Sequence, residues 1–428
     1  MSQIVGGLRR LSRFAVSPHI TLDARRWVVL TIVFLNLALL YGLWYSYSVF
    51  LVALLHDFHW SRSIIAGGFS VFLLVNGAMS PFVGWMTGRV GARWIILIGT
   101  SILGIGLGLA AHTSQWWHFY CAFGVIAAVG MTMAGWLPSI ILVRGWFLDR
   151  VGMAVGIASA GIGVGIAIVV PVTQHLIDLF GWRWTFRLLA FTIVLWVIPA
   201  TFCFVRDSPL KRALPTGQPA SRAALRSWSL WKTMRDSRYW QLGGVFFFGN
   251  MATQLLFVHQ VAYLVDHGVA PLAAASVGGL AGFASIVGKI LWGGLSDRTG
   301  REISYTWALS CLVASLGFLV LSGSQPASIF PYVYAALFGL GYAGTAALTP
   351  AATSDLFAGP GFSSIFGSLQ VFLCLGAALG SWGAGKIFDL TGRYTLALWL
   401  ALMASLAAPT LMWLAAPSRP KRPSAGDL

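Results

Sequence analysis

Long hydrophobic runs make up most of the chain, and short polar or charged segments separate them. Twelve runs are long enough to cross a hydrocarbon core of ~30 Å as helices that rise ~1.5 Å per residue. The runs lack the alternation of apolar and polar residues that marks membrane-spanning strands, so each backbone must satisfy its hydrogen bonds within a helix. The pattern predicts an all-α integral membrane protein with twelve transmembrane helices, near residues 27–50, 64–87, 94–112, 117–143, 152–173, 184–205, 239–265, 273–295, 303–323, 329–350, 363–385 and 392–416.

The composition agrees with a membrane protein. Of the 428 residues, 57% are hydrophobic and 9% are charged, and the mean hydropathy is +0.79. A soluble domain is less apolar, because it must cover itself with polar groups. The sequence has no nucleotide-binding loop, metal-ligand cluster or nucleophile with a nearby base, so we expect no enzyme activity, no metal and no cofactor. The four cysteines lie singly within runs, without metal or disulfide spacing: Cys121, Cys203, Cys311 and Cys374.

The net charge of +16 raises the question of nucleic-acid binding, but the charges do not gather on one folded face. If successive runs alternate in direction, all but six of the 28 Lys and Arg residues fall on the side that carries both termini. This asymmetry follows the positive-inside rule, so we expect both termini in the cytoplasm, a location in the cell (inner) membrane and no nucleic-acid partner. The six exceptions are Arg62, Arg183, Arg187, Lys289, Lys386 and Arg393.

A polar segment rich in Lys, Arg and Pro divides the runs into two sets of six. We expect a cytoplasmic tail at 1–26, a six-helix bundle at 27–205, a cytoplasmic linker at 206–238, a second six-helix bundle at 239–416 and a cytoplasmic tail at 417–428. The arginine-rich first segment also fits an amphipathic organelle-targeting sequence, which is the alternative to a cytoplasmic tail.

One loop occurs twice. "GWMTGRVGARW" follows the second run and "GGLSDRTGREI" follows the eighth, which indicates an internal duplication. Twelve runs in two halves with a G-x-x-x-D-R-x-G-R loop resemble the major facilitator superfamily. The second copy is a full match, whereas Gly88 replaces the acid in the first copy.

The resemblance implies that these loops form a conformational latch. In this superfamily the acid and the arginines hold the two bundles together by ion pairs and helix-end contacts in the outward-open state. The matching positions here are Gly84, Arg89 and Arg93 in the first copy and Gly293, Asp297, Arg298, Gly300 and Arg301 in the second.

A narrower resemblance covers most of the chain. The stretches "YSVFLVALLHDFHWSRSIIAGGFSVFLL", "RGWFLDRVGMAVGIASAGIGVGIAIVVP" and "GWRWTF" are similar to the monocarboxylate transporter branch and its bacterial relatives, including the oxalate/formate antiporter. The resemblance implies that a cation on the eighth helix, a few residues before the loop, binds the substrate carboxylate. The matching position is Lys289.

Lys289 lies inside the eighth run, in "GFASIVGKILWGGLSDRTGR". A lysine ~9 Å of helical rise from the end of a run can extend its amine into the headgroups. Helical side chains lean toward the N-terminus of their helix, however, which directs Lys289 toward the bilayer centre if both termini are cytoplasmic. Its helix face otherwise carries small residues, so we expect the amine to face a cavity; they are Gly278, Gly282, Ser285 and Gly293.

No acid is available to neutralise Lys289 within the membrane, because all twelve Asp and Glu residues fall in loops, tails or run ends. The missing counter-ion is then the substrate, and a single fixed cation favours a monoanion. The antiporter relative has a second cation on the eleventh helix, where this sequence has Gln370, a candidate for hydrogen bonding to the substrate. Proton-coupled members carry an acid four residues before the cation, and Ser285 stands there. Proton symport, exchange for a counter-anion and uniport stay open.

Other polar residues in the runs complete the predicted substrate site. The family match places Tyr45 near a helix-1 lysine of animal members, and the family's general arrangement favours Tyr342. Asn250 and Gln254 share one face of the seventh run. His259 lies in a stretch that resembles the family segment near the external gate, and it fits a gate, a proton carrier or a satisfied buried histidine.

The sequence therefore predicts a secondary active or facilitative transporter of a small carboxylate, a monocarboxylate, that works by alternating access as a monomer in the lipid bilayer. An efflux carrier of hydrophobic molecules is one alternative, since aromatic residues are abundant, but a lysine without a counter-ion disfavours organic cations. A transporter-like receptor that binds without translocating is another, although such receptors usually add a long soluble domain or tail for signalling.

Overall fold

The computed structural model describes residues 22–147, 151–207, 230–357 and 362–416. Within these ranges the chain forms helices and no strand. Residues 1–21 and 417–428 of the predicted tails and 208–229 of the predicted linker lie outside the described residues. The helices are α2 (Leu22–Tyr45), α3 (Tyr47–Phe58), α4 (Arg62–Val90), α5 (Ala92–Ala110), α6 (Trp116–Phe119), the π-helix η1 (Tyr120–Ala127), α7 (Ala128–Ala134), α8 (Trp136–Trp146), α9 (Val151–Phe204), α10 (Leu230–Thr233), α11 (Ser237–Asp266), α12 (Pro271–Thr299), α13 (Arg301–Ser324), α14 (Phe330–Leu356), α15 (Phe362–Thr391) and α16 (Thr395–Ala415).

Helix occupies the body of every predicted run, but the segmentation differs from the prediction. Ten helical segments of the described ranges are long and apolar enough to cross a membrane. One reason is that α9 joins the fifth and sixth runs across a kink at Gly181, whose φ of 76° is accessible to glycine without strain. The other reason is that α14, the helix of the predicted run near 329–350, is not among the ten segments that are long and apolar enough to cross a membrane.

The fourth run is not the continuous helix that its apolar length predicts. It passes through the π-helix η1 and breaks at Gly135, where φ is −83° and ψ is −138°. Pro138 lies in the first turn of α8 and has no backbone N–H to donate, so it suits the start of a new helix rather than the interior of a long one.

Several helices extend beyond the apolar runs, because backbone hydrogen bonding continues into polar residues at their ends. α12 ends at Thr299 rather than near 295, so Lys289 lies ten residues before the helix end. Ten residues correspond to ~15 Å of rise, compared with the ~9 Å expected from the run. Lys289 is therefore further from the end of its helix than the sequence indicated.

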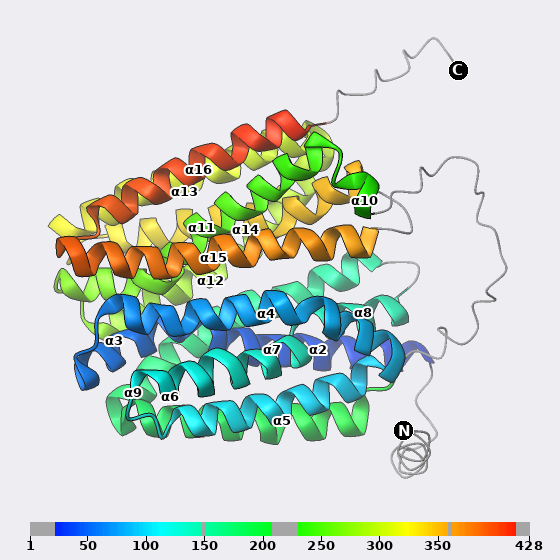
Figure 1. Cartoon of the computed structure of the whole chain (residues 1–428), viewed down its shortest axis with the longest axis horizontal. Helices are drawn as coiled ribbons and strands as arrows, with labels where there is room; N and C mark the ends of the chain where they lie inside the picture. Colours follow the sequence, from blue (N-terminus) through cyan, green and yellow to red (C-terminus); the bar gives the residue numbers. More distant parts are fainter. Residues whose placement is uncertain (1–21, 148–150, 208–229, 358–361, 417–428) are drawn as a thin grey trace.

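The helices form two groups that lie side by side in Figure 1, α2–α9 below and α11–α16 above. The start of α2 and the end of α16 lie at the same end of the molecule, together with α10. We call this the terminal end. The opposite end, where α3 ends and α4 begins, is called the Arg62 end.

Most of the described packing between the two groups comes from three helix pairs: α4 on α15, α9 on α12, and α3 on α11. Glycine allows the close approach between α9 and α12, because a Cβ atom at Gly282 would lie 2.5 Å from the Ile166 Cβ. In the α4–α15 contact, Ser70 Oγ donates to the Ala378 carbonyl over 2.7 Å. The glycine face of α12 is thus packed at Gly282, which corrects the expectation that the whole face lines a cavity.

The contacts stop toward the terminal end. A Cβ atom at Gly77 of α4 would lie 2.8 Å from Cys374 of the other group, but Gly84, on the same face, approaches only Leu137 of its own group. On the Lys289 face of α12, Gly293 has no atom within 4 Å of a built Cβ. The two groups therefore touch from the Arg62 end to about the level of Lys289 and separate beyond it.

The duplicated loop has the same geometry in both copies. Gly91 ends α4 and begins α5 with φ 101° and ψ 147°, and Gly300 ends α12 and begins α13 with φ 104° and ψ 155°. Positive φ of this size favours glycine. A single residue therefore connects the two helices in each copy.

Candidate functional site

Lys289, Tyr342 and Tyr45 lie together between the two groups of helices. Lys289 Nζ is 5.6 Å from the centre of the Tyr342 ring, and the Tyr342 hydroxyl oxygen is 2.8 Å from that of Tyr45. The three residues come from α12, α14 and the last position of α2. The structure thus brings three of the predicted site residues into one place.

Phe257 of α11 packs against the tyrosine pair. Its ring centre is 4.4 Å from that of Tyr45 and 4.9 Å from that of Tyr342. Both tyrosines are less than a tenth exposed, so ring packing and the shared hydrogen bond fix the two hydroxyl groups. No sequence pattern indicated this role for Phe257, because nothing in an apolar run distinguishes a packed phenylalanine from a lipid-facing one.

Lys289 is half-buried and has no acidic partner in the described ranges. An ammonium group inside a membrane helix is unfavourable unless a partner or water compensates its charge. The Lys289 position is therefore one that a bound anion would stabilise. The ion pairs that the described residues do form lie near helix ends and join Arg62 to Asp266, Arg183 to Asp57, and Arg301 to Asp297 and Asp355.

Asn250 and Ser285 bond within their own helices. Asn250 Nδ2 donates to the Phe246 carbonyl over 3.0 Å, and Ser285 Oγ donates to the Gly282 carbonyl over 2.7 Å. Ser285 is fully buried one turn before Lys289. Its hydroxyl hydrogen is therefore already used, and it does not replace the titrating acid of proton-coupled relatives.

Gln254 and Gln370 each carry a buried amide oxygen without a hydrogen-bond partner in the described ranges. Such an acceptor is unfavourable unless a ligand, water or another conformation supplies a donor. Gln254 belongs to α11, one turn from Phe257, whereas the described hydrogen bonds do not connect Gln370 of α15 with Lys289, Tyr45 or Tyr342. Gln254 is therefore the better placed of the two.

His259 belongs to a different cluster, at the Arg62 end. Its Nδ1 is 3.0 Å from the Tyr394 hydroxyl, and its Nε2 is 2.8 Å from the Ser381 carbonyl oxygen. The side chain is 3% exposed. Both ring nitrogens are occupied, so the grouping of His259 with the substrate-binding residues does not hold in this conformation. This geometry fits a satisfied buried histidine, and it also fits a gate residue at a closed end.

Arg62 connects the two groups of helices at this end. The Asp389 carboxylate accepts hydrogen bonds from the backbone N–H groups of Arg62 and Ser63 over 2.9 and 2.8 Å. The Arg62 guanidinium donates to Asp266 and, over 2.6 Å, to the Tyr394 hydroxyl. A carboxylate at the first turn of α4 is also favoured by the helix dipole. Sequence reasoning placed Arg62 on the outer side but missed its partners, which come from separate segments.

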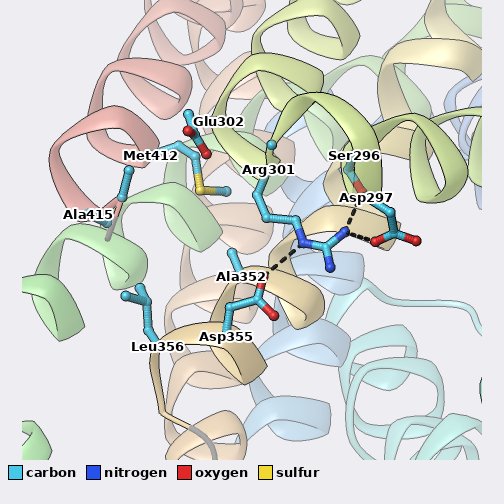
Figure 2. A pocket seen from close by; sticks show the side chains of 11 residues that line it. Ser296, Asp297, Arg301, Glu302, Ala352, Asp355, Leu356, Met412 and Ala415 are labelled. Carbon is cyan, nitrogen blue, oxygen red and sulfur yellow. Dashed lines mark hydrogen bonds and ion pairs between the residues drawn. The ribbon is translucent and has the colours of Figure 1, made fainter. Parts of the chain in front are cut away.

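The second copy of the repeated loop forms ion pairs around Arg301 (Figure 2). Arg301 Nε is 2.9 Å from Asp355, and its Nη1 is 2.7 Å from Asp297 and 2.5 Å from the Ser296 hydroxyl. These residues border a cavity of about 300 Å³ between the ends of α12, α13, α14 and α16. All of them belong to the α11–α16 group, so the described contacts of this predicted latch do not join the two groups here.

The first copy obtains its acid from another segment. Asp207, just after α9, accepts hydrogen bonds from the backbone N–H groups of Ala92 and Arg93 over 2.9 and 3.3 Å. Arg93 also donates through Nη2 to the Phe202 carbonyl over 2.5 Å. The first copy thus has a carboxylate at the start of α5, bonded to backbone amides and again within one group of helices.

Two further arginines of the predicted latch are exposed. Arg89 lies over the Trp85 ring, 4.1 Å from its centre, and Arg298 is in the last turn of α12. Neither forms an ion pair with a described residue.

Many apolar helices long enough to cross a membrane, in two groups that touch at one end and separate at the other around a lone cation, define a multi-pass transmembrane transporter. The chain belongs to the Major Facilitator Superfamily, whose sequence model matches residues 33–381.

Curated relatives are transporters rather than enzymes. The chain is 24% identical to monocarboxylate transporter 13 of Rattus norvegicus, with 86% of this chain and 84% of the relative covered. It is 23% identical to monocarboxylate transporter 2 of Homo sapiens (86% and 80% covered), and 24% identical to the uncharacterized MFS-type transporter YcxA of Bacillus subtilis (87% and 90%). Among solved structures, a bacterial homolog of the human lysosomal transporter Spinster, described as inward-facing and unoccupied, shares the fold with a TM-score of 0.66, 17% identity and coverage of 92% and 95%.

Proposed function

We propose that this transporter carries a small organic monoanion, a monocarboxylate, by alternating access, and that Lys289 binds the carboxylate. One observation carries the proposal: Lys289 is ten residues inside α12, beside the Tyr45–Tyr342 pair, and has no acidic partner in the described ranges. A substrate carboxylate supplies the missing negative charge and accepts hydrogen bonds from the ammonium group. The relatives that are named monocarboxylate transporters support the same class.

The contacts between the two groups of helices support alternating access. They are close from the Arg62 end to the level of Lys289, and a Cβ built at Gly293 beyond it meets no atom within 4 Å, as expected for a site that is reached from the terminal end. In the opposite state the Arg62 end opens and the terminal end closes. The moving units are 27–205 and 239–416, connected by the segment 206–238.

The proposed orientation follows the distribution of charge. The terminal end carries most of the Lys and Arg residues and faces the cytoplasm, and the Arg62 end faces outward from the cell membrane. A monomer contains both groups of helices and so the whole proposed site.

Coupling does not use an acid beside Lys289, because Ser285 occupies that position and bonds to its own helix. The remaining co-transported species are a counter-anion in exchange, or a proton carried elsewhere than at Ser285. A pH gradient and a preloaded anion, applied separately, distinguish these from uniport.

Uptake of labelled carboxylates into proteoliposomes tests the proposal. Lactate, pyruvate, acetate, oxalate and an aromatic acid form the panel, with native protein, Lys289→Gln and Lys386→Gln compared. We expect transport of a monocarboxylate by the native protein and by Lys386→Gln, whose lysine is near the Arg62 end of α15. Loss of a charged hydrogen bond predicts that Lys289→Gln lowers transport at limiting substrate by at least tenfold, roughly 1.5 kcal/mol or more.

The alternatives predict other results. A carrier that expels hydrophobic molecules transports none of the panel and keeps its activity in Lys289→Gln. A receptor without translocation binds a carboxylate in a thermal-shift assay but gives no uptake. Native-like uptake by a folded Lys289→Gln variant contradicts the assigned site.

A further inference from the structure

The hydrogen bonds of His259 define which of its nitrogens carries the proton. The Ser381 carbonyl oxygen, 2.8 Å from Nε2, only accepts hydrogen bonds, so Nε2 carries a hydrogen. In the neutral imidazole Nδ1 then carries no hydrogen and only accepts, so the Tyr394 hydroxyl donates to it over 3.0 Å while its oxygen accepts from the Arg62 guanidinium over 2.6 Å. The series Arg62 to Tyr394 to His259 to Ser381 satisfies every group when the imidazole is neutral.

A proton on Nδ1 disrupts this series. Nδ1 then becomes a donor, so the Tyr394 oxygen receives two donors and its own hydrogen has to leave the bond. Tyr394 is 5% exposed and His259 is 3% exposed, so a displaced hydroxyl hydrogen has little access to water. A buried polar group without a partner is unfavourable. The protonated imidazole also places a second cation at the same tyrosine hydroxyl that Arg62 contacts.

The other charges nearby are already engaged. The Asp389 carboxylate accepts the two backbone N–H groups at the start of α4, and Asp266 is paired with Arg62 over 2.7 Å. Neither carboxylate is placed to accept a hydrogen bond from Nδ1. The effect of protonating His259 is therefore decided by the competition between the Nδ1 hydrogen and the Tyr394 hydroxyl hydrogen. The titratable or charged groups around His259 are Arg62 from α4, Asp389 from α15, Tyr394 before α16, and Tyr263, Asp266 and His267 from α11.

We propose that His259 is a proton-binding site that controls the Arg62 end: the neutral imidazole keeps this end closed, and the protonated imidazole opens it. The closed end needs Tyr394 to bond both Arg62 and His259, and the first of these partners lies across the contact between the two groups of helices. Acidic solution therefore shifts the protein toward the state open at the Arg62 end. This inference does not depend on the identity of the substrate.

The distance between the two groups at the Arg62 end tests the proposal directly. Gln115 and Gln325 are exposed residues in the connections after α5 and after α13, one in each group. Spin labels at Gln115→Cys and Gln325→Cys, in a variant that lacks the native cysteines, report this distance by pulsed electron paramagnetic resonance. The full chain is held in nanodiscs with the same pH on both sides, at about pH 8 and about pH 5, the range in which histidine titrates.

We expect the short distance to predominate at the higher pH and the fraction with a longer distance to rise on the order of tenfold at the lower pH, the effect of losing about one buried hydrogen bond. The His259→Gln side chain can donate to Ser381 and accept from Tyr394 but does not titrate. We therefore expect this variant to keep the short distance at both pH values. His267→Gln is the matched control. His267 lies eight residues further along the chain and contacts Tyr263. We expect His267→Gln to show the same rise in the longer distance at the lower pH as the native protein.

Tyr394→Phe provides an independent reading if His259→Gln does not fold. This variant removes the hydroxyl that connects Arg62 to His259, so the longer distance rises already at the higher pH. The proposal is overturned if the distance distribution of the native protein is the same at both pH values. It is also overturned if folded His259→Gln shows the same change with pH as the native protein, or if Tyr394→Phe leaves the Arg62 end closed. Because the measurement uses no substrate, its failure is separable from a failure of the carboxylate assignment.

Discussion

The hydroxyl oxygens of Tyr45 and Tyr342 lie 2.8 Å apart, and this hydrogen bond crosses from one group of helices to the other beside Lys289. The pair is therefore part of the contact between the groups and part of the proposed substrate site. The bond fixes both hydroxyl groups beside the lysine, where the proposed anion would lie.

The shared bond predicts non-additive effects. We expect Tyr45→Phe and Tyr342→Phe each to raise KM for the transported carboxylate about fivefold to tenfold, because one buried hydrogen bond is worth about 1 kcal/mol. The KM of the double variant should not exceed that of the single variant with the higher KM, since both changes remove the same hydrogen bond. Concentration-dependent uptake measures these values, and Tyr332→Phe, at an exposed tyrosine, serves as the control. Additive losses would show that the hydroxyl groups act separately.

Asp389 should control which end of the transporter is open. Asp389→Asn removes the charge that accepts the N–H groups of Arg62 and Ser63, and charged hydrogen bonds contribute about 1.5–3 kcal/mol. We expect the state closed at the Arg62 end to lose population by about tenfold or more, measured by spin-label distances across that end. Asp57→Asn is the matched control, because Asp57 pairs with Arg183 inside one group of helices. Equal shifts in both variants would contradict the special role of Asp389.

Two glycines on one face of α12 should respond differently to a methyl group. Gly282→Ala places Cβ 2.5 Å from Ile166, whereas Gly293→Ala meets no atom within 4 Å. Overpacking of this kind costs about 1–3 kcal/mol, so Gly282→Ala should destabilise the state closed at the Arg62 end and leave less of the protein in it. The same distance measurement checks this, with Gly293→Ala expected to match the native protein. A native distance distribution in Gly282→Ala would mean that α9 and α12 can separate without opening this end.

Tyr305 and Tyr334 are both fully buried, yet only one of their hydroxyl groups has a partner. The Tyr305 hydroxyl has none in the described ranges, whereas Tyr334 donates to Gln260 Oε1 over 2.9 Å. Removing an unpaired buried hydroxyl is neutral or stabilising, and removing a paired one costs about 1–2 kcal/mol. Thermal unfolding of Tyr305→Phe should occur at the native temperature or above it, and that of Tyr334→Phe below it. The reverse order would indicate an unseen partner for Tyr305.

The sequence predicted the helices well, because hydropathy reports a local quantity, the preference of each residue for lipid over water. It also predicted the repeated loop and placed Lys289 inside a helix. It did not predict where α12 ends, since helical hydrogen bonding continues past the apolar residues. It also missed the π-helix at Tyr120–Ala127 and the break at Gly135, which depend on backbone geometry rather than on apolar length.

Contacts between distant segments were the main limit. Nothing local to Arg62 identifies Asp389 as its partner, and nothing at Gly88 indicates that Asp207 supplies a carboxylate nearby. The spacing of small residues predicts one continuous glycine face on α12, although Gly282 packs on α9 and Gly293 does not. Such distinctions arise only when the helices meet. The family resemblance supplied the link between Lys289 and Tyr342 that residue spacing alone could not give.

The Asp389 carboxylate holds main-chain amides of α4 rather than side chains. Every residue except proline offers the same amide, so replacing Arg62 or Ser63 removes their side-chain contacts and leaves this attachment in place. The carboxylate itself has no such substitute. Sequence drift is therefore expected to be tolerated at Ser63 and restricted at Asp389, and also at Arg62 because its side chain bonds Tyr394, a difference that saturation mutagenesis of both segments under transport selection would make visible.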